Sequence, residues 1–159
     1  MRKSMILAAA VFAVGASVAA AQPKKDIGYD SRANAFEQLD AAVTKAAADD
    51  KLLLLVSGGD WCIWCHYLAE FLEREKALDS ALHEVFVVQK IYVGDENVNK
   101  DFFARLPKAA GAPHFWVLSG KGELLASQDT VPLEDGKKSY DAAKFSAFIE
   151  QWRGRAAGN

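Results

Sequence analysis

The feature that most constrains the fold is a pair of cysteines, Cys62 and Cys65, the only two in the chain. An apolar run at residues 52–56 precedes them and predicts a buried strand. After them, apolar residues recur at helical spacing over residues 64–72 and predict an amphipathic helix. Two consecutive glycines supply the turn between these elements. The cysteines therefore stand where a strand passes into the first turn of a helix.

This placement favours redox chemistry at the cysteine pair. The N-terminal turn of a helix offers unpaired N–H groups and the positive end of the helix dipole, which together lower the pKa of a thiol. Cys65 follows Cys62 by about one helical turn, so the two sulfurs share a face. We expect Cys62 to attack a substrate disulfide and Cys65 to resolve the mixed disulfide. A purely structural bridge across so short a loop stabilises a fold poorly.

The same residues also fit other chemistries. Together with His66, the pair matches C-x-x-C-H, the attachment motif of c-type haem. If the N-terminal segment is removed, no methionine remains, and His83 and His114 are the histidine candidates for the second axial position. A zinc site is a weaker interpretation, because the full set of ligands is not apparent. We expect no metal and no cofactor beyond the redox-active disulfide.

Residues 1–21 have the pattern of a signal peptide. Arg2 and Lys3 form a basic start, an alanine-rich apolar run follows, and three alanines at 19–21 make a small-residue cleavage site before Gln22. The apolar run is too short for a membrane span, and no cysteine stands at the cut to carry a lipid. The sequence predicts export to the periplasm or secretion, with no stable membrane insertion after cleavage.

The remaining chain is long enough for one domain with a real core. We expect a lead-in at 22–30, a domain at 31–153 and a C-terminal tail at 154–159. The formal net charge of −2 becomes more negative when the signal is removed, which argues against nucleic acid and anionic membranes as partners. Two cysteines are too few for a disulfide scaffold. We expect a monomer.

The other predicted elements follow from apolar periodicity and from turn residues. Asn34 and Glu37 resemble a capping box at the start of the first helix. An apolar strand, a turn with two glycines and a second strand predict a β-hairpin headed by Pro113. The expected elements are a helix from 34 to about 50, a helical turn at 78–84, a strand at 85–93, a helix at 97–106, a hairpin at 111–127, a solvated loop at 129–140, and a final helix before a loose tail that begins at 153.

In this order, with Gly-Asp-Trp-Cys-Ile-Trp-Cys at 59–65, Gly-Ala-Pro at 111–113 and the hairpin turn at 121–123, the chain resembles exported thioredoxin-like proteins. The resemblance implies a single α/β domain with a central mixed sheet flanked by helices. It implies a cis bond at Pro113, which exposes the backbone of Ala112 for pairing with a substrate peptide. It also implies protein thiols and disulfides as substrates and an upstream redox partner.

The chain departs from the pattern of the family at several positions. Val56 stands where thioredoxins place a buried aspartate, so the proton acceptor for Cys65 is missing or comes from elsewhere. Asp60 is expected to be solvated and Lys90 to face water at a strand edge. His114 stands where a small hydroxyl residue is usual, and could either donate a hydrogen bond to a thiolate or point at solvent.

Four tryptophans divide between the site and the core. Trp61 is expected to pack over the rim of the site and Trp64 to be a partly exposed contact, both available to extended substrates. Trp116 and Trp152 follow strand and helix spacing and are expected in the core. His66 is expected to be a modest local modulator of the cysteines.

Three functions from different classes remain open. The expected one is an exported thiol–disulfide oxidoreductase, since a haem motif requires neither the preceding strand nor the proline-headed hairpin. The alternatives are a c-type haem electron carrier and a redox-silent binding module with the same fold. The dipeptide Ile63-Trp64 between the cysteines does not decide among reductase, oxidase and isomerase.

Overall fold

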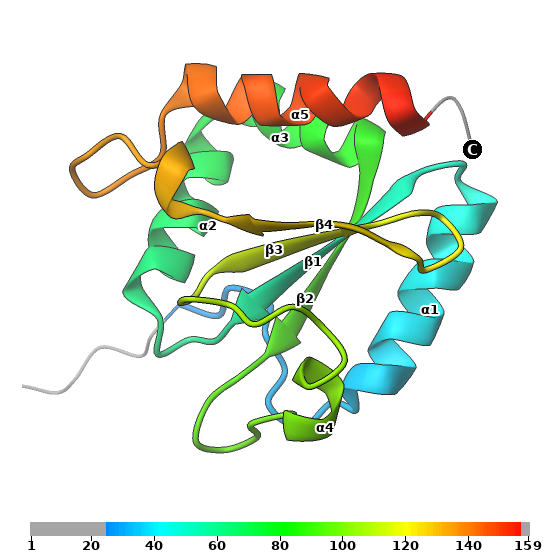
Figure 1. The fold of residues 1–159 in the computed structure, drawn as a ribbon. Coiled ribbons are helices and arrows are strands. Elements are labelled where there is room, and N and C mark those ends of the chain that lie inside the picture. Colours follow the sequence, from blue (N-terminus) through cyan, green and yellow to red (C-terminus); the bar gives the residue numbers. More distant parts are fainter. Residues whose placement is uncertain (1–24, 157–159) are drawn as a thin grey trace, which may run out of the picture.

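The computed structural model describes residues 25–156 (Figure 1). The predicted signal peptide lies outside the described residues, as do the first residues of the lead-in and the last three of the tail. The elements in chain order are α1 (Ala35–Ala48), β1 (Leu52–Gly58), α2 (Ile63–Arg74), α3 (Lys76–Val85), β2 (Phe86–Tyr92), α4 (Lys100–Phe103), β3 (His114–Leu118), β4 (Leu124–Asp129), the 3-10 turn η1 (Val131–Leu133) and α5 (Ala142–Ala156).

A four-stranded mixed sheet in the order β2-β1-β3-β4 forms the centre of the domain. β1 pairs in parallel with β2 and antiparallel with β3, and β3 pairs antiparallel with β4. All seven residues of β1 are buried, which explains why its sequence is a continuous apolar run rather than an alternating one. The expected α/β fold with a central mixed sheet and flanking helices is confirmed.

The side chains of β1 alternate between two hydrophobic cores, one on each face of the sheet. Leu52, Leu54 and Val56 join the core that α2, α3 and α5 cover. Leu53 and Leu55 join the core that α1 and α4 cover. Figure 1 shows these two sets of helices on opposite sides of the sheet. Each fully buried leucine contributes about 1.5–3 kcal/mol relative to an exposed one, so β1 stabilises both layers.

The start of α1 follows the predicted capping pattern. Asn34 has extended backbone angles, and its Oδ1 accepts hydrogen bonds from the backbone N–H groups of Phe36 and Glu37. The side chain of Glu37 meets Asn34 Nδ2 at 3.4 Å. The two bonds to Oδ1 satisfy backbone N–H groups that a helix start leaves unpaired, which contributes about 1 kcal/mol.

The helices on either side of β2 differ from the sequence prediction. The helical turn expected at 78–84 is a ten-residue helix, α3, whose Leu82 and Val85 are buried. The helix expected at 97–106 is only α4, because Asn99 has a left-handed backbone (φ 46°) and breaks the helix before residue 100. After α4, the N–H groups of Arg105 and Leu106 bond to carbonyls three residues back, which tightens the chain into turns.

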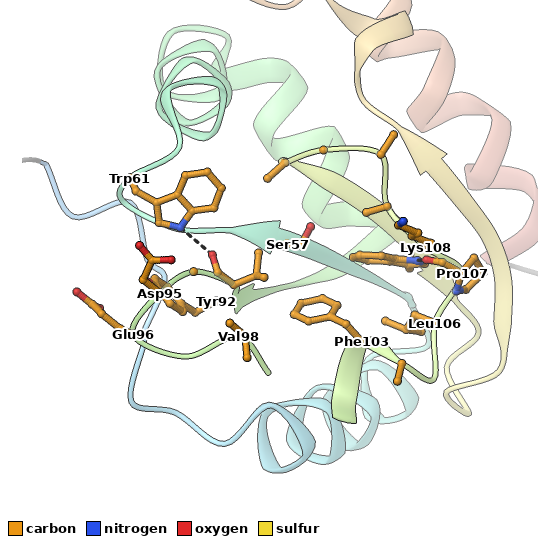
Figure 2. A pocket seen from close by; sticks show the side chains of 18 residues that line it. Ser57, Trp61, Tyr92, Asp95, Glu96, Val98, Phe103, Leu106, Pro107 and Lys108 are labelled. Carbon is orange, nitrogen blue, oxygen red and sulfur yellow. Dashed lines mark hydrogen bonds between the residues drawn. The ribbon is translucent and has the colours of Figure 1, made fainter. Parts of the chain in front are cut away.

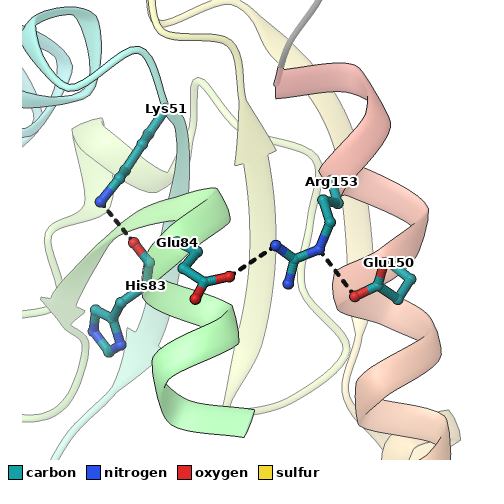
Figure 3. Close-up of polar contacts among 5 residues, drawn as sticks. All are labelled: Lys51, His83, Glu84, Glu150 and Arg153. Atoms are coloured by element: carbon teal, nitrogen blue, oxygen red, sulfur yellow. Dashed lines mark hydrogen bonds and ion pairs between the residues drawn. The ribbon is translucent and has the colours of Figure 1, made fainter. Parts of the chain in front are cut away.

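The last helix is longer than predicted, because residues 153–156 continue α5 rather than starting a loose tail. Arg153 donates hydrogen bonds to Glu84 Oε2 of α3 at 2.8 Å and to Glu150 Oε1 at 3.0 Å (Figure 3). Arg155 lies over the ring of Trp152, with its guanidinium carbon 4.8 Å from the ring centroid. These contacts give the final turn partners that periodicity alone does not reveal.

Two segments predicted to be polar connections contribute to the core. In the lead-in, Ile27 and Tyr29 are 6% and 8% exposed. In the loop at 129–140, Leu133 and Tyr140 are 6% and 3% exposed, so the expectation of a plain solvated connection is wrong. All four side chains pack into the core beneath α2. Residues from the lead-in and from the loop before α5 therefore pack against α2, the helix that carries the CxxC motif.

Within residues 25–156, none of the helices combines the length and the apolar character needed to cross a bilayer.

Candidate redox site

Cys62 and Cys65 form a disulfide at the N-terminus of α2, with their Cα atoms 5.2 Å apart. Cys62 is the N-cap residue: its backbone is extended, and its Sγ accepts a hydrogen bond from the N–H of Cys65 at 3.1 Å. The same sulfur lies at the positive end of the helix dipole. Both effects stabilise a thiolate at Cys62 when the disulfide is open, as the sequence predicts.

Both cysteines are nevertheless buried, with exposed fractions of 4% for Cys62 and 2% for Cys65. The placement at a helix start suggests an exposed nucleophile at Cys62, but in the disulfide this residue is covered. The cause is the chain segment before β3, because the carbonyl oxygen of Ala112 lies 3.3 Å from Cys62 Sγ. In the disulfide this sulfur has no proton to donate, whereas a thiol at Cys62 could donate to that carbonyl.

The segment that covers Cys62 is held from two directions. The Ala112–Pro113 peptide bond is cis. Directly after it, β3 pairs with β1, with His114 opposite Ser57. The hydroxyl of Thr130, only 3% exposed, donates a hydrogen bond to the carbonyl of Pro113 at 2.8 Å. The loop after β4 thus fixes the backbone that lies against the reactive sulfur.

Trp61 is the large exposed side chain of the site. It is 52% exposed, and its Nε1–H donates to the carbonyl of Val93 at 2.7 Å (Figure 2). This bond fixes the ring beside the loop that follows β2, rather than over the sulfurs. Trp61 and Ala112 both line a groove of about 990 Å³. The groove therefore extends to the residue whose carbonyl touches Cys62.

The groove is formed largely by two loops (Figure 2). One is the loop after β2, and the other runs from the end of α4 toward Pro113. Its floor includes Trp116, and its rim carries the carboxylates of Asp95 and Glu96 and the ammonium group of Lys108. Val98 adds an apolar side chain that is 57% exposed. The result is an apolar channel with charged edges beside the disulfide.

Trp64, the other tryptophan of the motif, does not line this groove. Its ring packs edge-on against Tyr67, with ring centroids 5.3 Å apart, and against Tyr140 at 6.0 Å. The side chain is half-buried at the edge of the core. It joins α2 to the loop before α5. Trp116 and Trp152, each 2% exposed, are core residues as predicted.

His66, which follows Cys65, contacts the backbone of Asp60 in the loop before the CxxC motif. Its Nε2 lies 2.9 Å from the carbonyl oxygen of Asp60, and since a carbonyl only accepts, this nitrogen carries the proton. The contact joins the second turn of α2 to the loop that carries Trp61. His66 thus positions the motif without touching either sulfur in the contacts observed.

Asp60 and Lys90 are less solvated than the sequence predicts. Asp60 Oδ1 is buried and has no hydrogen-bond partner within the described residues. Lys90, opposite Val56 in the sheet, donates a hydrogen bond to the carbonyl of Ile27. Burial lowers the pKa of the Lys90 ammonium group, and the carboxylates of Asp26 and Asp60 partly offset this. The lead-in segment lies over this lysine, which leaves it only partly exposed.

His114 takes neither of the two positions considered from the sequence. It is 5% exposed, its Nε2 lies 2.8 Å from the hydroxyl of Ser127, and its ring packs on Trp116 with centroids 4.6 Å apart. Its Nδ1 is buried and finds no hydrogen-bond partner among residues 25–156. Burial lowers the pKa of His114, with partial compensation from Asp129 on β4. His114 is therefore a neutral side chain within the sheet, not a contact of Cys62.

This burial predicts that acid destabilises the protein through His114. Because the pKa is lower in the folded state, the unfolded chain binds the proton more readily. The free energy of unfolding should fall as the pH drops below about 6.5, the ordinary pKa of histidine, and the loss is complete below the lowered pKa. In His114→Gln, the free energy of unfolding measured with urea should change less between pH 8 and pH 5 than it does in the wild type. If the free energy of unfolding depends on pH as strongly in the variant as in the wild type, other groups cause the acid sensitivity. The difference in unfolding free energy between the two proteins at pH 8 measures the cost of the substitution apart from titration.

The residues that sequence reasoning missed lie in the lead-in and in the loop before α5. Ile27 and Tyr29 alternate as the apolar residues of a polar segment, which is the one signal that could have indicated a packed, extended stretch. Tyr29 reaches the site itself, since its hydroxyl lies 3.4 Å from the carbonyl of Ser57. In the described part of the chain, histidine, cysteine and carboxylate side chains nowhere form a cluster of three suited to a metal ion.

Comparisons with known proteins agree with this geometry. The family model described as thioredoxin-like matches residues 34–120. A crystal structure described as a disulphide isomerase from Xylella fastidiosa Temecula1 is similar, with 26% identity, a TM-score of 0.67, and coverage of 79% of this chain and 96% of that one. A redox protein from Chlamydomonas reinhardtii is 25% identical with a TM-score of 0.44, over 63% of this chain and 31% of that one.

No curated protein matches the chain. The family match spans more than half of the sequence and includes α1, the CxxC turn and β3. Together with the sheet order, the disulfide at the start of α2 and the proline-headed β3, it establishes the relationship. The chain belongs to the thioredoxin-like family.

Proposed function

We propose that the protein is a thiol–disulfide oxidoreductase that exchanges disulfides with protein substrates. In the oxidised protein, a substrate thiolate attacks Cys62 Sγ, the Cys62–Cys65 bond breaks, and its electron pair stays on Cys65 as a thiolate. A second substrate thiolate then attacks the substrate sulfur of this mixed disulfide and releases Cys62 as a thiolate. In the other direction, the Cys62 thiolate attacks a substrate disulfide, forms a mixed disulfide and expels one substrate thiolate; Cys65 then attacks Cys62 Sγ and releases the other. A separate redox partner restores the starting state.

The observation that carries this proposal is the arrangement around Cys62 Sγ. Cys62 is the N-cap of α2, its sulfur accepts a hydrogen bond from the N–H of Cys65, and it lies 3.3 Å from the carbonyl oxygen of Ala112. A helix N-terminus makes Cys62 a good leaving and attacking group. The sulfur of Cys65 is bonded to it and more deeply buried, as suits a resolving cysteine.

The alternatives have less support. A c-type haem carrier needs the C-x-x-C-H motif, but it requires neither the buried strand before the motif nor the proline-headed β3 beside it. A redox-silent binding module would not need a polarised cysteine at a helix N-terminus. We also propose export, on the composition of residues 1–21.

Among the possible directions we favour disulfide rearrangement. The support is the likeness to a Xylella structure described as a disulphide isomerase, with 26% identity and a TM-score of 0.67. An isomerase needs a disulfide that is neither strongly reducing nor strongly oxidising. The expected reduction potential is therefore near about −180 mV, between about −270 mV for thioredoxin and about −120 mV for a strong oxidant.

The test is a redox titration in glutathione buffers, followed by alkylation and intact-mass measurement. The protein should be expressed with its full N-terminal sequence in a host that can export proteins and attach haem. Reversible titration of two thiols would support the oxidoreductase. A mass heavier by one haem with no thiol to alkylate would replace it with the electron carrier. The same mass would show whether the recovered chain begins at Gln22.

We propose that the groove beside Trp61 holds an extended apolar segment of the substrate protein. Trp61→Ala should raise KM for a protein substrate about tenfold and change kcat little, because an exposed aromatic anchor contributes somewhat more than 1 kcal/mol to binding. Reaction with oxidised glutathione should be nearly unaffected, because so small a disulfide does not fill the groove. Leu124→Ala, 43% exposed at the far end of the sheet from Pro113, is the matched control. Equal losses with both substrates would count against a binding role.

A further inference from the structure

The charge that appears on Cys65 has no partner on β1. When a substrate thiolate attacks Cys62 Sγ, Cys65 leaves as a thiolate, although Cys65 is only 2% exposed. A buried anion is costly unless a hydrogen bond or an opposite charge stabilises it. The neighbouring residue of β1 that lines the same cavity is Val56, whose side chain has no polar atom. Another element must therefore supply the stabilising group.

Tyr29, in the segment before α1, brings its hydroxyl close to Cys65 Sγ at Gly58, the last residue of β1. A Cβ on Gly58 would lie 2.5 Å from Cys65 Sγ and 2.7 Å from the Tyr29 hydroxyl oxygen. The two atoms therefore both lie against the Cα hydrogen side of Gly58, with too little room between them for a methyl group. Any residue larger than glycine at position 58 would separate them, which gives a reason for glycine at the end of β1.

The Tyr29 hydroxyl is poorly satisfied in the oxidised protein. The acceptor within reach is the carbonyl oxygen of Ser57, at 3.4 Å, whereas a hydroxyl normally lies 2.5–3.0 Å from its oxygen acceptor. Tyr29 is 8% exposed, so water does not readily compensate. Burial raises the pKa of Tyr29 well above its usual value, and nearby Tyr140 and Asp60 raise it further. The group therefore keeps its proton and remains a donor.

The surroundings allow the sulfur to move toward this hydroxyl. A cavity of about 30 Å³ is bordered by Tyr29, Cys65, Val56 and Lys90, among others. The Lys90 ammonium nitrogen lies 5.5 Å from the centroid of the Tyr29 ring and bonds to the carbonyl of Ile27. The ionisable groups that act on this region are Tyr29 and Asp26 in the lead-in, Asp60 after β1, Asp79 on α3, Lys90 on β2, and Tyr140 before α5.

We propose that the Tyr29 hydroxyl donates a hydrogen bond to Cys65 Sγ whenever that sulfur is a thiolate. The proposal rests on the function proposed above and adds a residue to its site. As the Cys62–Cys65 bond breaks, the electron pair goes to Cys65, and Tyr29 turns from the Ser57 carbonyl to the sulfur without transferring its proton. When Cys65 attacks Cys62 again, the hydroxyl returns to the carbonyl.

The test compares Tyr29→Phe with Tyr140→Phe. Both replacements keep a buried ring and remove one hydroxyl, but the Tyr140 hydroxyl points to the carbonyl of Trp64, at 3.5 Å, and not to a sulfur. Cysteines labelled with ¹³C at Cβ report the pKa of each thiol separately by NMR titration of the reduced protein. In Tyr29→Phe the pKa of Cys65 should rise by about one unit, the effect of losing one hydrogen bond to a charged group. Neither the pKa of Cys65 in Tyr140→Phe nor that of Cys62 in Tyr29→Phe should change.

Two results would overturn the proposal. One is an unchanged Cys65 titration in a folded Tyr29→Phe protein, and the other is an equal rise in both tyrosine variants, which would indicate a general packing effect. Lys90→Met tests the other group that could stabilise the thiolate. If this variant alone changes the pKa of Cys65, the lysine and not Tyr29 stabilises the thiolate. Failure of the proposed function is a distinct result, since the wild-type thiols would then not exchange with glutathione, whatever their titration shows.

Discussion

Cys62→Ser should abolish disulfide exchange. In an assay that follows reduction of a protein disulfide, the variant should not exceed the rate given by the small-molecule thiol alone. The reason is that a serine hydroxyl at the start of α2 remains protonated at neutral pH, so the nucleophile that the helix N-terminus stabilises is lost. The fold should persist, because Cys62 contributes one small side chain to the core and a disulfide across so short a loop stabilises little.

Cys65→Ser provides the matched control, since it removes the other sulfur by the same substitution. Here Cys62 can still attack, but nothing resolves the product, so a mixed disulfide with the substrate protein should accumulate. Denaturing electrophoresis without reductant would show this adduct in Cys65→Ser and not in Cys62→Ser. Adducts in the opposite variant would reverse the roles of the two cysteines. If the wild type itself neither exchanges disulfides nor forms adducts, the redox-silent binding module would be favoured.

Phe145→Ala should give the largest loss of stability among single changes outside the site. Phe145 on α5 is fully buried, and its ring packs against Phe71 of α2 at 5.3 Å and against Phe148 at 6.2 Å between centroids. Replacing a buried phenylalanine by alanine costs about 3–5 kcal/mol, from lost burial and the cavity left behind. Urea unfolding at neutral pH measures this as a lower midpoint with little change of slope.

The control for this change is Leu124→Ala on β4, where the side chain is 43% exposed. A substitution at such a surface position usually alters the free energy of unfolding by no more than about 0.5 kcal/mol. Because Phe145 packs against Phe71 of α2, the helix that begins at the disulfide, the variant should also lose activity at temperatures where it remains mostly folded. A Phe145→Ala protein as stable as the wild type would mean that α5 does not close this core.

The sequence predicts the central part of the fold well, because there each residue belongs to a strong local pattern. The continuous apolar run of β1, the capping box at Asn34 and the proline-headed hairpin each have a local cause. The redox pair is also visible, since two cysteines at this spacing have few other uses. These elements position the disulfide and the strand beside it, and the family match at 34–120 includes all of them except the second strand of the hairpin.

What the sequence did not reveal depends on contacts between residues far apart in the chain. The sequence around Lys90 predicts a solvated strand residue. In the structure, Lys90 donates a hydrogen bond to the carbonyl of Ile27, 63 positions away in the chain. Tyr29 and Tyr140 lie in polar segments. The alternation of Ile27 and Tyr29 is too short to assign Tyr29 to the core beside Cys65, and no periodicity includes Tyr140. His114 follows the proline as expected, but only the register with β4 places Ser127 against its ring.

The buried lead-in has a consequence for where this domain can be trimmed. The family model begins at residue 34, after the segment that contains Ile27 and Tyr29. A shortened protein cut at that boundary would keep every helix and strand but open the floor under the disulfide to water. Its cysteines would then titrate in a wetter environment than those of the full chain. Measurements on such a fragment would describe a different redox centre, so the domain boundary should be set before Lys25.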